Sequence, residues 1–289
     1  MATLAERSIA APVLRPGAGL RRALKVAIPH AILILFSAAI LLPLLWVFRV
    51  SLTDKVIAYR IPPEWTPPKL DNYIEIFSAY PFATWFTNSV VVALASTAIA
   101  LPLATAMAYA FARFNTGGNW LRLGVLSGQM LPPVILVLPL FTLFLTAGLL
   151  NTHVALIVAH LTINVPFLAW LLVAFFEGEA KQLEEAARVE GCTRFQAFAH
   201  VAVPVAAPGI LAAGLLGFIL SWNEFLLALI LSGSRTNTLP VGLSALETHR
   251  GVEIALLAAA TLFAMVPVFL LLPFLRKYLI KGLSLGALK

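Results

Sequence analysis

Long apolar runs separated by short polar segments dominate the pattern of hydrophobic and polar positions along the chain. A helix crosses the hydrocarbon core of a bilayer with about 20 apolar residues, whereas a surface helix of a soluble protein is apolar on one face only. Six runs approach this length, at about residues 31–47, 90–112, 122–147, 154–176, 209–231 and 254–275. The alternating pattern of a membrane β-barrel is absent. The sequence therefore predicts an all-α, polytopic membrane bundle of six transmembrane helices.

The longest charged segment lies in the loop 177–208, between the fourth and fifth apolar runs. Residues three and four apart share one face of a helix, so the start of this loop predicts a helix with two unlike sides. The apolar side holds Ala180, Leu183, Ala186 and Ala187, and the charged side holds Lys181, Glu184, Glu185 and Arg188. Gly191 then predicts a turn, and a short apolar stripe predicts a second helix that stops at Pro204.

Prolines mark two further segments. Pro132, Pro133 and Pro139 lie inside the third apolar run, where their missing N–H donors predict a kinked helix. The segment 51–84 combines prolines with tryptophan and tyrosine, which is typical of an ordered outer loop at the membrane interface. A simple connector is an equally good interpretation of that segment.

Composition supports the membrane interpretation. Hydrophobic residues make up 61% of the chain and charged residues 11%, whereas about a quarter of the residues of a soluble domain are charged. The net charge of +7 raises nucleic-acid binding as an alternative, but the basic residues are spread over chain ends and short loops instead of forming one stripe. We therefore expect the lipid bilayer as a partner and no nucleic acid.

Lysines and arginines are distributed unevenly between the two sides of the six-span arrangement. The N-terminal tail, the loops after the second and fourth spans and the C-terminus hold 14 of them, and the other side holds 5. Cytoplasmic loops of membrane proteins carry the excess of positive charge. We therefore expect both termini and the loop 177–208 in the cytoplasm, with the first helix uncleaved.

These expectations divide the chain into four parts. Residues 1–25 form a cytoplasmic N-terminal tail, and residues 26–84 form the first transmembrane helix and an outer loop. Residues 85–276 form the transmembrane core, which includes the cytoplasmic loop 177–208. Residues 277–289 form a cytoplasmic C-terminal tail.

Phosphate-loop, zinc-protease and metal-cluster motifs are absent. The chain has no GxxxxGK[ST] phosphate loop, no HExxH and no His/Cys set with metal-ligand spacing. We therefore expect no catalytic residue, no metal site and no bound cofactor, so that any ATP hydrolysis belongs to a partner. Cys192 is the single cysteine, which excludes an intramolecular disulfide.

Polar residues inside the apolar runs are the candidates for a solute pathway, because a charge in hydrocarbon costs at least about 2.5 kcal/mol. Glu224, next to Asn223, is the only acid within a predicted span. It either faces a water-filled pathway or a partner helix, or lies close enough to the outer interface to be hydrated. His160, Thr162 and Asn164 form a second cluster, which lines a solute route or makes the commoner helix-to-helix hydrogen bonds.

The loop 177–208 resembles the EAA loop of binding-protein-dependent ABC importer permeases. The family spacing is kept by Glu185-Ala186-Ala187, by Gly191 and by Val201-x-Val203-Pro204, with valines in place of isoleucine and leucine. Asn88-Ser89 and the segments 221–225 and 281–289 are similar to the carbohydrate branch, in particular to its maltose-transporter-like small subunit. The similarity extends from about residue 30 to the C-terminus, and Pro273 and Leu275 depart from the pattern.

The resemblance implies a permease subunit with a type I ABC importer transmembrane fold in a bacterial inner membrane. A second permease subunit, in a heterodimer, would complete the pathway. Two copies of a cytoplasmic ATPase would bind ATP and Mg, and an extracytoplasmic solute-binding protein would deliver a sugar or sugar-like solute. The residues implied in ATPase coupling are Glu184, Glu185, Ala186, Ala187, Gly191 and Pro204. The pathway candidates are Asn164, Asn223 and Glu224.

Two other functions stay open on the residues alone. Glu224 or His160 could couple ions to solute movement in a secondary transporter. The chain could also be a non-transporting membrane subunit that holds an assembly together.

Overall fold

The computed structural model describes residues 18–178, 181–248 and 251–286, and it divides into one unit up to Arg49 and a second from Val50 onward. The first unit is helix α1 (Ala18–Ser51), whose last two residues enter the second unit. α1 begins before the expected end of the tail 1–25, so part of that tail is helical. Most of its apolar side chains are exposed from Val26 to Phe48, as expected of a helix whose surroundings are lipid or another subunit.

The segment after α1 is ordered, as one of the two interpretations of 51–84 expected. It contains a short 3-10 turn η1 (Ile57–Tyr59) and helix α2 (Asp71–Ser78). The buried Asn72 side chain donates hydrogen bonds to the carbonyls of Ser51 and Thr53, each at 2.9 Å. These bonds fix α2 against the chain that leads into it.

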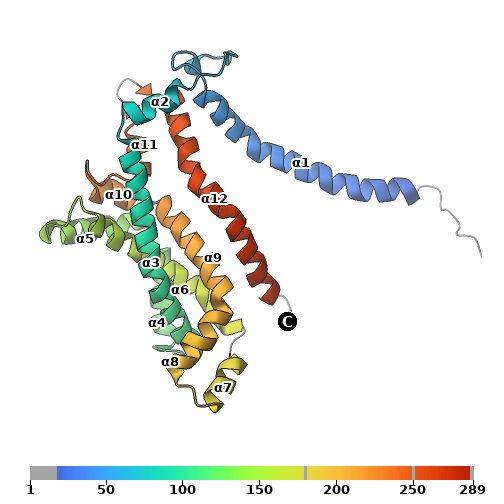
Figure 1. Cartoon of the computed structure of the whole chain (residues 1–289), viewed down its shortest axis with the longest axis vertical. Helices are drawn as coiled ribbons and strands as arrows, with labels where there is room; N and C mark the ends of the chain where they lie inside the picture. Colours follow the sequence, from blue (N-terminus) through green and yellow to red (C-terminus); the bar gives the residue numbers. More distant parts are fainter. Residues whose placement is uncertain (1–17, 179–180, 249–250, 287–289) are drawn as a thin grey trace, which may run out of the picture. The chain divides into compact units, whose positions relative to one another are not determined.

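Three long helices form the centre of the second unit (Figure 1): α3 (Phe82–Phe114), α6 (His153–Gly178) and α9 (Val203–Trp222). Buried alanines at 100, 104 and 108 of α3 and at 169 of α6 lie where these helices meet. Small residues let helix backbones approach closely. Lipid is as apolar as the helices, so this close packing, and not a hydrophobic driving force, holds membrane helices together. Helix α12 (Ile254–Gly286) packs on α9 and α2.

The third predicted span is broken, where the sequence predicts only a kink. Helix α4 (Gly118–Met130) and helix α5 (Pro133–Thr146) meet at an angle of 94°. Pro132 and Pro133 explain the break, because a proline cannot donate to the preceding turn and sits well at the start of a new helix.

The fifth predicted span is also interrupted, which corrects the expectation of one helix over 209–231. α9 ends at Trp222, and helix α10 (Leu226–Leu231) begins after Phe225. The Glu224 carboxylate accepts the backbone N–H groups of Leu227 and Ala228 at 2.8 and 3.0 Å. A side chain that satisfies these donors allows a second helix to begin inside an apolar run.

The charged loop contains helix α7 (Lys181–Val189), a turn at Gly191 and helix α8 (Arg194–Ala197). We call residues 181–204 the coupling segment, after the role that the family resemblance implies for it. The expected stop at Pro204 is wrong, because the π-helical turn η2 (Phe198–Ala202) carries α8 directly into α9. Pro204 lies in the first turn of α9, where a missing N–H donor costs little. Ala180 lies outside the described residues.

The segment between α10 and α12 is compact. It contains helix α11 (Leu239–Ser244) and two short antiparallel strands, β1 (Glu247–Thr248) and β2 (Gly251–Val252), with Glu247 opposite Val252. α12 continues to Gly286, so the expected C-terminal tail 277–289 is helical up to that residue. Within the described ranges five helices are long and apolar enough to span a membrane, or six if α4 and α5 count as one broken span. The prediction of a polytopic helical bundle is confirmed.

Candidate functional site

The coupling segment is fixed to the bundle by Glu184, whose side chain is buried. Arg113, near the end of α3, donates from Nε and Nη2 to Glu184 Oε1 at 3.0 and 2.9 Å. The Tyr109 hydroxyl donates to Glu184 Oε2 at 2.9 Å. Arg113 Nη1 also donates to the Phe176 carbonyl at the end of α6. One guanidinium group therefore ties α3, α6 and α7 together.

The buried position of Glu184 corrects the predicted faces of α7. The sequence places Glu184 on the charged outward side, together with Glu185. In the structure only 6% of Glu184 is exposed, while Leu183 from the predicted apolar side is 54% exposed. The physical reason is the charge of Arg113, because a cation and a phenol at the helix surface attract a carboxylate more strongly than they attract a leucine.

The outward face of α7 combines apolar and acidic side chains. Leu183, Glu185 and Ala186 are exposed, as is Val189 at 90%. Glu185 has only a loose ion pair, with Lys181 at 4.0 Å. Phe195, in the following helix, is 75% exposed. An apolar patch with acids beside it is typical of a protein-binding surface.

The turn between α7 and α8 depends on two local features. Gly191 has φ +99°, a backbone conformation that favours glycine because a side chain would be strained there. Thr193 then forms a reciprocal cap with Gln196: the Gln196 N–H donates to Thr193 Oγ1, and the Thr193 N–H donates to Gln196 Oε1. The two features set the direction in which α8 leaves the turn.

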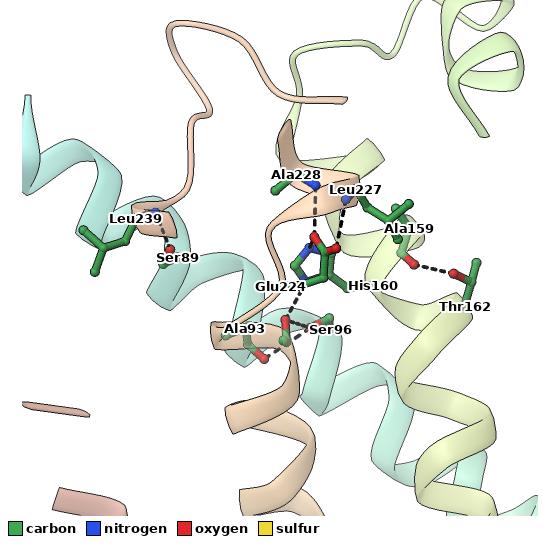
Figure 2. A network of polar contacts seen from close by, with 11 residues as sticks. Ser89, Ala93, Ser96, Ala159, His160, Thr162, Glu224, Leu227, Ala228 and Leu239 are labelled. Carbon is green, nitrogen blue, oxygen red and sulfur yellow. Dashed lines mark hydrogen bonds and ion pairs between the residues drawn. The ribbon is translucent and has the colours of Figure 1, made fainter. Parts of the chain in front are cut away.

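A second polar cluster lies deep in the bundle, where α3, α6 and the break after α9 meet (Figure 2). Ser96 Oγ is 3.0 Å from Ser221 Oγ, which is hydrogen-bonded to His160 Nδ1 at 2.6 Å. His160 Nε2 faces Glu224 Oε2 at 3.5 Å. Four side chains from three helices and the break thus form one continuous buried chain.

A cavity of about 460 Å³, the central cavity, opens beside this chain of polar groups. All three pathway candidates, Asn164, Asn223 and Glu224, line it together with His160 and Ser221. Asn164 is 1% exposed, and neither its amide nitrogen nor its amide oxygen has a hydrogen-bond partner. Asn223 also lines a second cavity of about 400 Å³ beside α12. The structure therefore brings together the residues that the sequence proposes from two separate spans.

Sequence reasoning missed four of the residues that build these two sites: Arg113, Tyr109, Ser96 and Ser221. Arg113 could have been found, because it directly follows an apolar run and a charge at the end of such a run is expected to have a buried partner. The serines offer none, since serine is common at contacts between membrane helices. Among the residues that the structure describes, no three His, Cys, Asp or Glu side chains come close enough to hold a metal ion.

Asn88 and Ser89 of α3 lie in a third polar cluster, where α3 meets the loop after α10. The Asn88 amide nitrogen donates to the carbonyls of Arg235 and Asn237 at 3.1 and 3.0 Å, and its oxygen is 2.8 Å from His153 Nε2. Ser89 accepts the Leu239 N–H at 2.7 Å, as Figure 2 shows. These bonds fold the loop after α10 onto α3 and α6.

Comparison with known proteins gives a consistent result. Residues 100–285 match the family described as binding-protein-dependent transport system inner membrane component. The sulfoquinovosyl glycerol transport system permease protein SmoH of Agrobacterium fabrum is 36% identical over 86% of this chain and 89% of its own length. The trehalose transport system permease protein SugB of Mycobacterium tuberculosis is 34% identical over 94% and 99%. The diacetylchitobiose uptake system permease protein DasC of Streptomyces coelicolor is 31% identical over 90% and 96%.

Solved structures share the fold. A chain of a bacterial ABC transporter involved in the import of the acidic polysaccharide alginate superimposes with a TM-score of 0.67 at 21% identity. The match covers 89% of this chain and 98% of that one. A chain from the alginate ABC transporter in complex with a periplasmic protein bound to an alginate pentasaccharide gives the same TM-score at 16% identity, over 90% and 96%.

Proposed function

The chain belongs to the family of binding-protein-dependent transport system inner membrane components, and we propose that it couples sugar import to ATP hydrolysis through the outward face of α7. It is a multi-pass permease subunit of an ABC importer in the bacterial inner membrane. The ATPase that binds ATP and Mg is a separate subunit, present in two copies. A second permease subunit completes the pathway, and a solute-binding protein delivers the solute from outside.

The observation that carries this proposal is the way in which α7 is held. Its inner side is fixed by the Glu184–Arg113 ion pair, with side chains 7% and 8% exposed. Its outer side leaves Leu183, Glu185 and Ala186 exposed. A partner that binds the exposed side of such a helix and then moves will pass its movement to the bundle, because the other side of the helix is rigidly attached there.

The covalent path supports the same role. α8, η2 and α9 follow one another without a break, and α9 ends at the central cavity. Displacing the coupling segment therefore moves α9 directly, and it moves α3 through Arg113. We infer that closure of the ATPase subunits displaces α7 and switches the bundle between two states that open on opposite sides. This requires the coupling segment and both termini to be cytoplasmic.

The solute class rests on the relatives. Proteins 31–36% identical to this chain are named for sulfoquinovosyl glycerol, trehalose and diacetylchitobiose, which all contain sugar rings. We therefore propose a sugar or sugar-like solute for this importer. Asn164, Asn223 and Glu224 are the residues of this subunit that we assign to the pathway, because they line one cavity.

ATP-dependent uptake by the assembled transporter tests the coupling role. Glu185→Lys reverses a charge on the outward face, and Gly191→Pro demands a φ near −65° where the chain has +99°. We expect each to lower uptake at least about tenfold, the equivalent of about 1.4 kcal/mol in the coupling equilibrium. Asn119→Lys, at an exposed residue outside α7, is the matched control and should leave uptake unchanged.

Copurification of the ATPase must be measured in parallel. Loss of ATPase binding would support a role for α7 in docking the ATPase. Loss of uptake with ATPase binding retained would support a role for α7 in transmitting movement. Unchanged uptake in both variants would remove the proposed role of the coupling segment.

A further inference from the structure

A small groove lies between α4 and the last two turns of α6. It has a volume of about 180 Å³ and shares no described lining residue with the central cavity. Trp170, Ala174 and Glu177 line it from α6, on one face of that helix, and Arg122 and Val125 line it from α4. Sites for whole small molecules typically have volumes of about 300–1,000 Å³, so this groove has room for only part of a larger ligand.

The charged residues of the groove lie at one end of it. Arg122 Nη1 donates to Glu177 Oε1 at 2.8 Å, and both side chains are partly exposed. Arg122 begins the third apolar run of the sequence and Glu177 follows the fourth, so this end lies where the hydrocarbon of a bilayer meets the headgroups. The exposed Trp120 is at the same end of α4, and tryptophan is enriched at that level of a membrane.

The rest of the groove is apolar. Phe111, Ala169 and Val173 are buried residues of its lining, and Trp170 is exposed. Trp170 precedes Glu177 by seven residues, which is about 10 Å along α6. The groove therefore has a charged end at the membrane surface and an apolar part that points into the hydrocarbon. A membrane phospholipid has the same polarity.

The ion pair can bind a zwitterionic headgroup without separating. It engages Nη1 of Arg122 and Oε1 of Glu177, whereas a guanidinium group has five N–H donors and a carboxylate has two accepting oxygens. Arginine suits phosphate oxygens, with which it makes charge-assisted hydrogen bonds. A carboxylate suits a primary ammonium, which donates N–H groups and has the opposite charge. A quaternary ammonium has no N–H to donate, and an anionic headgroup brings only negative charge towards Glu177.

We propose that the groove between α4 and α6 is a binding site for a phospholipid with a phosphate and a primary ammonium in its headgroup, which is phosphatidylethanolamine. Arg122 binds the phosphate, and Glu177 accepts hydrogen bonds from the ammonium. The first part of one acyl chain lies along Val125, Ala174 and Trp170. This site depends neither on the solute that the transporter carries nor on the coupling role of α7.

Photolabelling of the assembled transporter in phosphatidylcholine bilayers tests the site. Three probes carry the same diazirine in one acyl chain, close to the glycerol, and differ only in their ethanolamine, choline or glycerol headgroup. Each is added in trace amount, and mass spectrometry quantifies the labelled peptides relative to the total labelling of the complex. We expect the ethanolamine probe to label peptides from residues 118–130 and 166–178 at least about tenfold more than the choline probe does.

Three variants assign the parts of the site. Glu177→Gln should bring labelling by the ethanolamine and choline probes to within about twofold of each other, because the amide lacks the negative charge. Arg122→Gln should lower labelling by all three probes, since all three contain a phosphate. Ala174→Phe fills the groove without changing a charge and should remove the headgroup preference along with the label.

A second ion pair provides the matched control. Arg60 Nη1 and Glu64 Oε1 are also 2.8 Å apart, in the segment between α1 and α2. Arg60→Gln together with Glu64→Gln should leave labelling of the groove unchanged. Thermal unfolding of every variant should match that of the wild type, because partly exposed ion pairs contribute little to stability.

The wild-type chain alone can overturn the proposal. Equal labelling of the groove by the ethanolamine and choline probes would do so, and stronger labelling by the glycerol probe would show a site for anionic lipid instead. No label on either peptide would mean that a partner subunit covers the groove, which also excludes the site. A headgroup preference that persists in Glu177→Gln would show that Glu177 does not bind the ammonium and would overturn the assignment.

Discussion

Two largely buried glutamates of this protein have opposite surroundings. Glu184 meets a guanidinium group and a phenol from its own chain, which leave its two oxygens fully engaged. Glu224 accepts two backbone N–H groups and faces His160, beside an asparagine with no partner and a cavity. The first carboxylate joins α7 to α3 through side chains, and the second lies beside a buried amide that no described group satisfies.

The difference follows from how many hydrogen bonds each region completes by itself. Around Arg113 and Glu184, all three guanidinium nitrogens and both carboxylate oxygens have partners on α3, α6 or α7. Beside the central cavity, the Asn164 amide and His160 Nε2 have no hydrogen-bond partner among the described residues. A fully satisfied polar network rigidifies its surroundings, whereas a partly satisfied one leaves buried polar groups at a cost in free energy.

The largest expected effect tests the coupling region. Glu184→Ala leaves the Arg113 charge buried without its carboxylate, and we expect a loss of about 3–5 kcal/mol in the free energy of unfolding of the assembled complex. Thermal unfolding followed by tryptophan fluorescence measures it. Tyr109→Phe, which removes only the phenol hydrogen bond, should cost about 1 kcal/mol.

A double variant separates the buried charge from the lost packing. Glu184→Leu together with Arg113→Met replaces the pair by apolar side chains and should recover most of the stability. Equal losses in the single and double variants would show that the pair is not what joins α7 to α3.

The next effect concerns the chain of polar groups that supports the cavity. Ser221→Ala removes the group that links Ser96 to His160, and we expect a loss of about 1–3 kcal/mol, because His160 Nδ1 loses its partner. Ser244→Ala, whose hydroxyl bonds only within α11, is the control and should cost less than about 0.5 kcal/mol. A loss no larger than that of the control would mean that the buried chain is not cooperative.

Asn164→Leu should affect stability in the opposite direction. The amide has no partner to lose, so we expect the free energy of unfolding to stay within about 1 kcal/mol of the wild-type value or to rise. The same thermal measurement reports it. A destabilisation as large as that of Ser221→Ala would contradict the contrast between the satisfied polar groups around Glu184 and the unsatisfied amide near Glu224.

The smallest effect comes from an exposed acid outside both regions. A hydrogen bond from the Val56 N–H, and after it the contact with Lys69, lower the pKa of Asp54. The ionised Asp54 side chain therefore stabilises the fold above the ordinary pKa of an aspartate, and this stabilisation disappears as pH falls through the lowered pKa. Asp54→Asn should therefore be slightly less stable at pH 7 and indistinguishable from wild type in strong acid. A difference at pH 7 as large as that of Tyr109→Phe would show that exposed pairs matter as much as the buried joint.

Much of this arrangement can be predicted from the sequence, because the apolar runs, Gly191 and the spacing of the coupling segment are local signals. The three cavity residues are also predictable, since each is a polar side chain in an apolar run. That these three residues line one cavity could not be predicted, because it depends on the break at Asn223. That break carries no glycine or proline, and it is made by a glutamate that accepts the N–H groups of the next helix.

The inward position of Glu184 could not be predicted for a related reason. Glu184 and Glu185 are adjacent, and nothing local decides which of them faces the bundle. Arg113 decides it from 71 residues away, and only the packing of α3 on α6 brings it there. Pro204 is a similar case, because its tolerance depends on the π-helical turn before it.

The Arg113–Glu184 pair also has a consequence for how sequences of this kind diverge. A substitution at either position alone strands a buried charge, so intermediates with one partner missing are selected against. The two positions can change only together, by a compensating second substitution. Descendants that lose the arginine should therefore have lost the glutamate as well, although 70 residues of chain separate them.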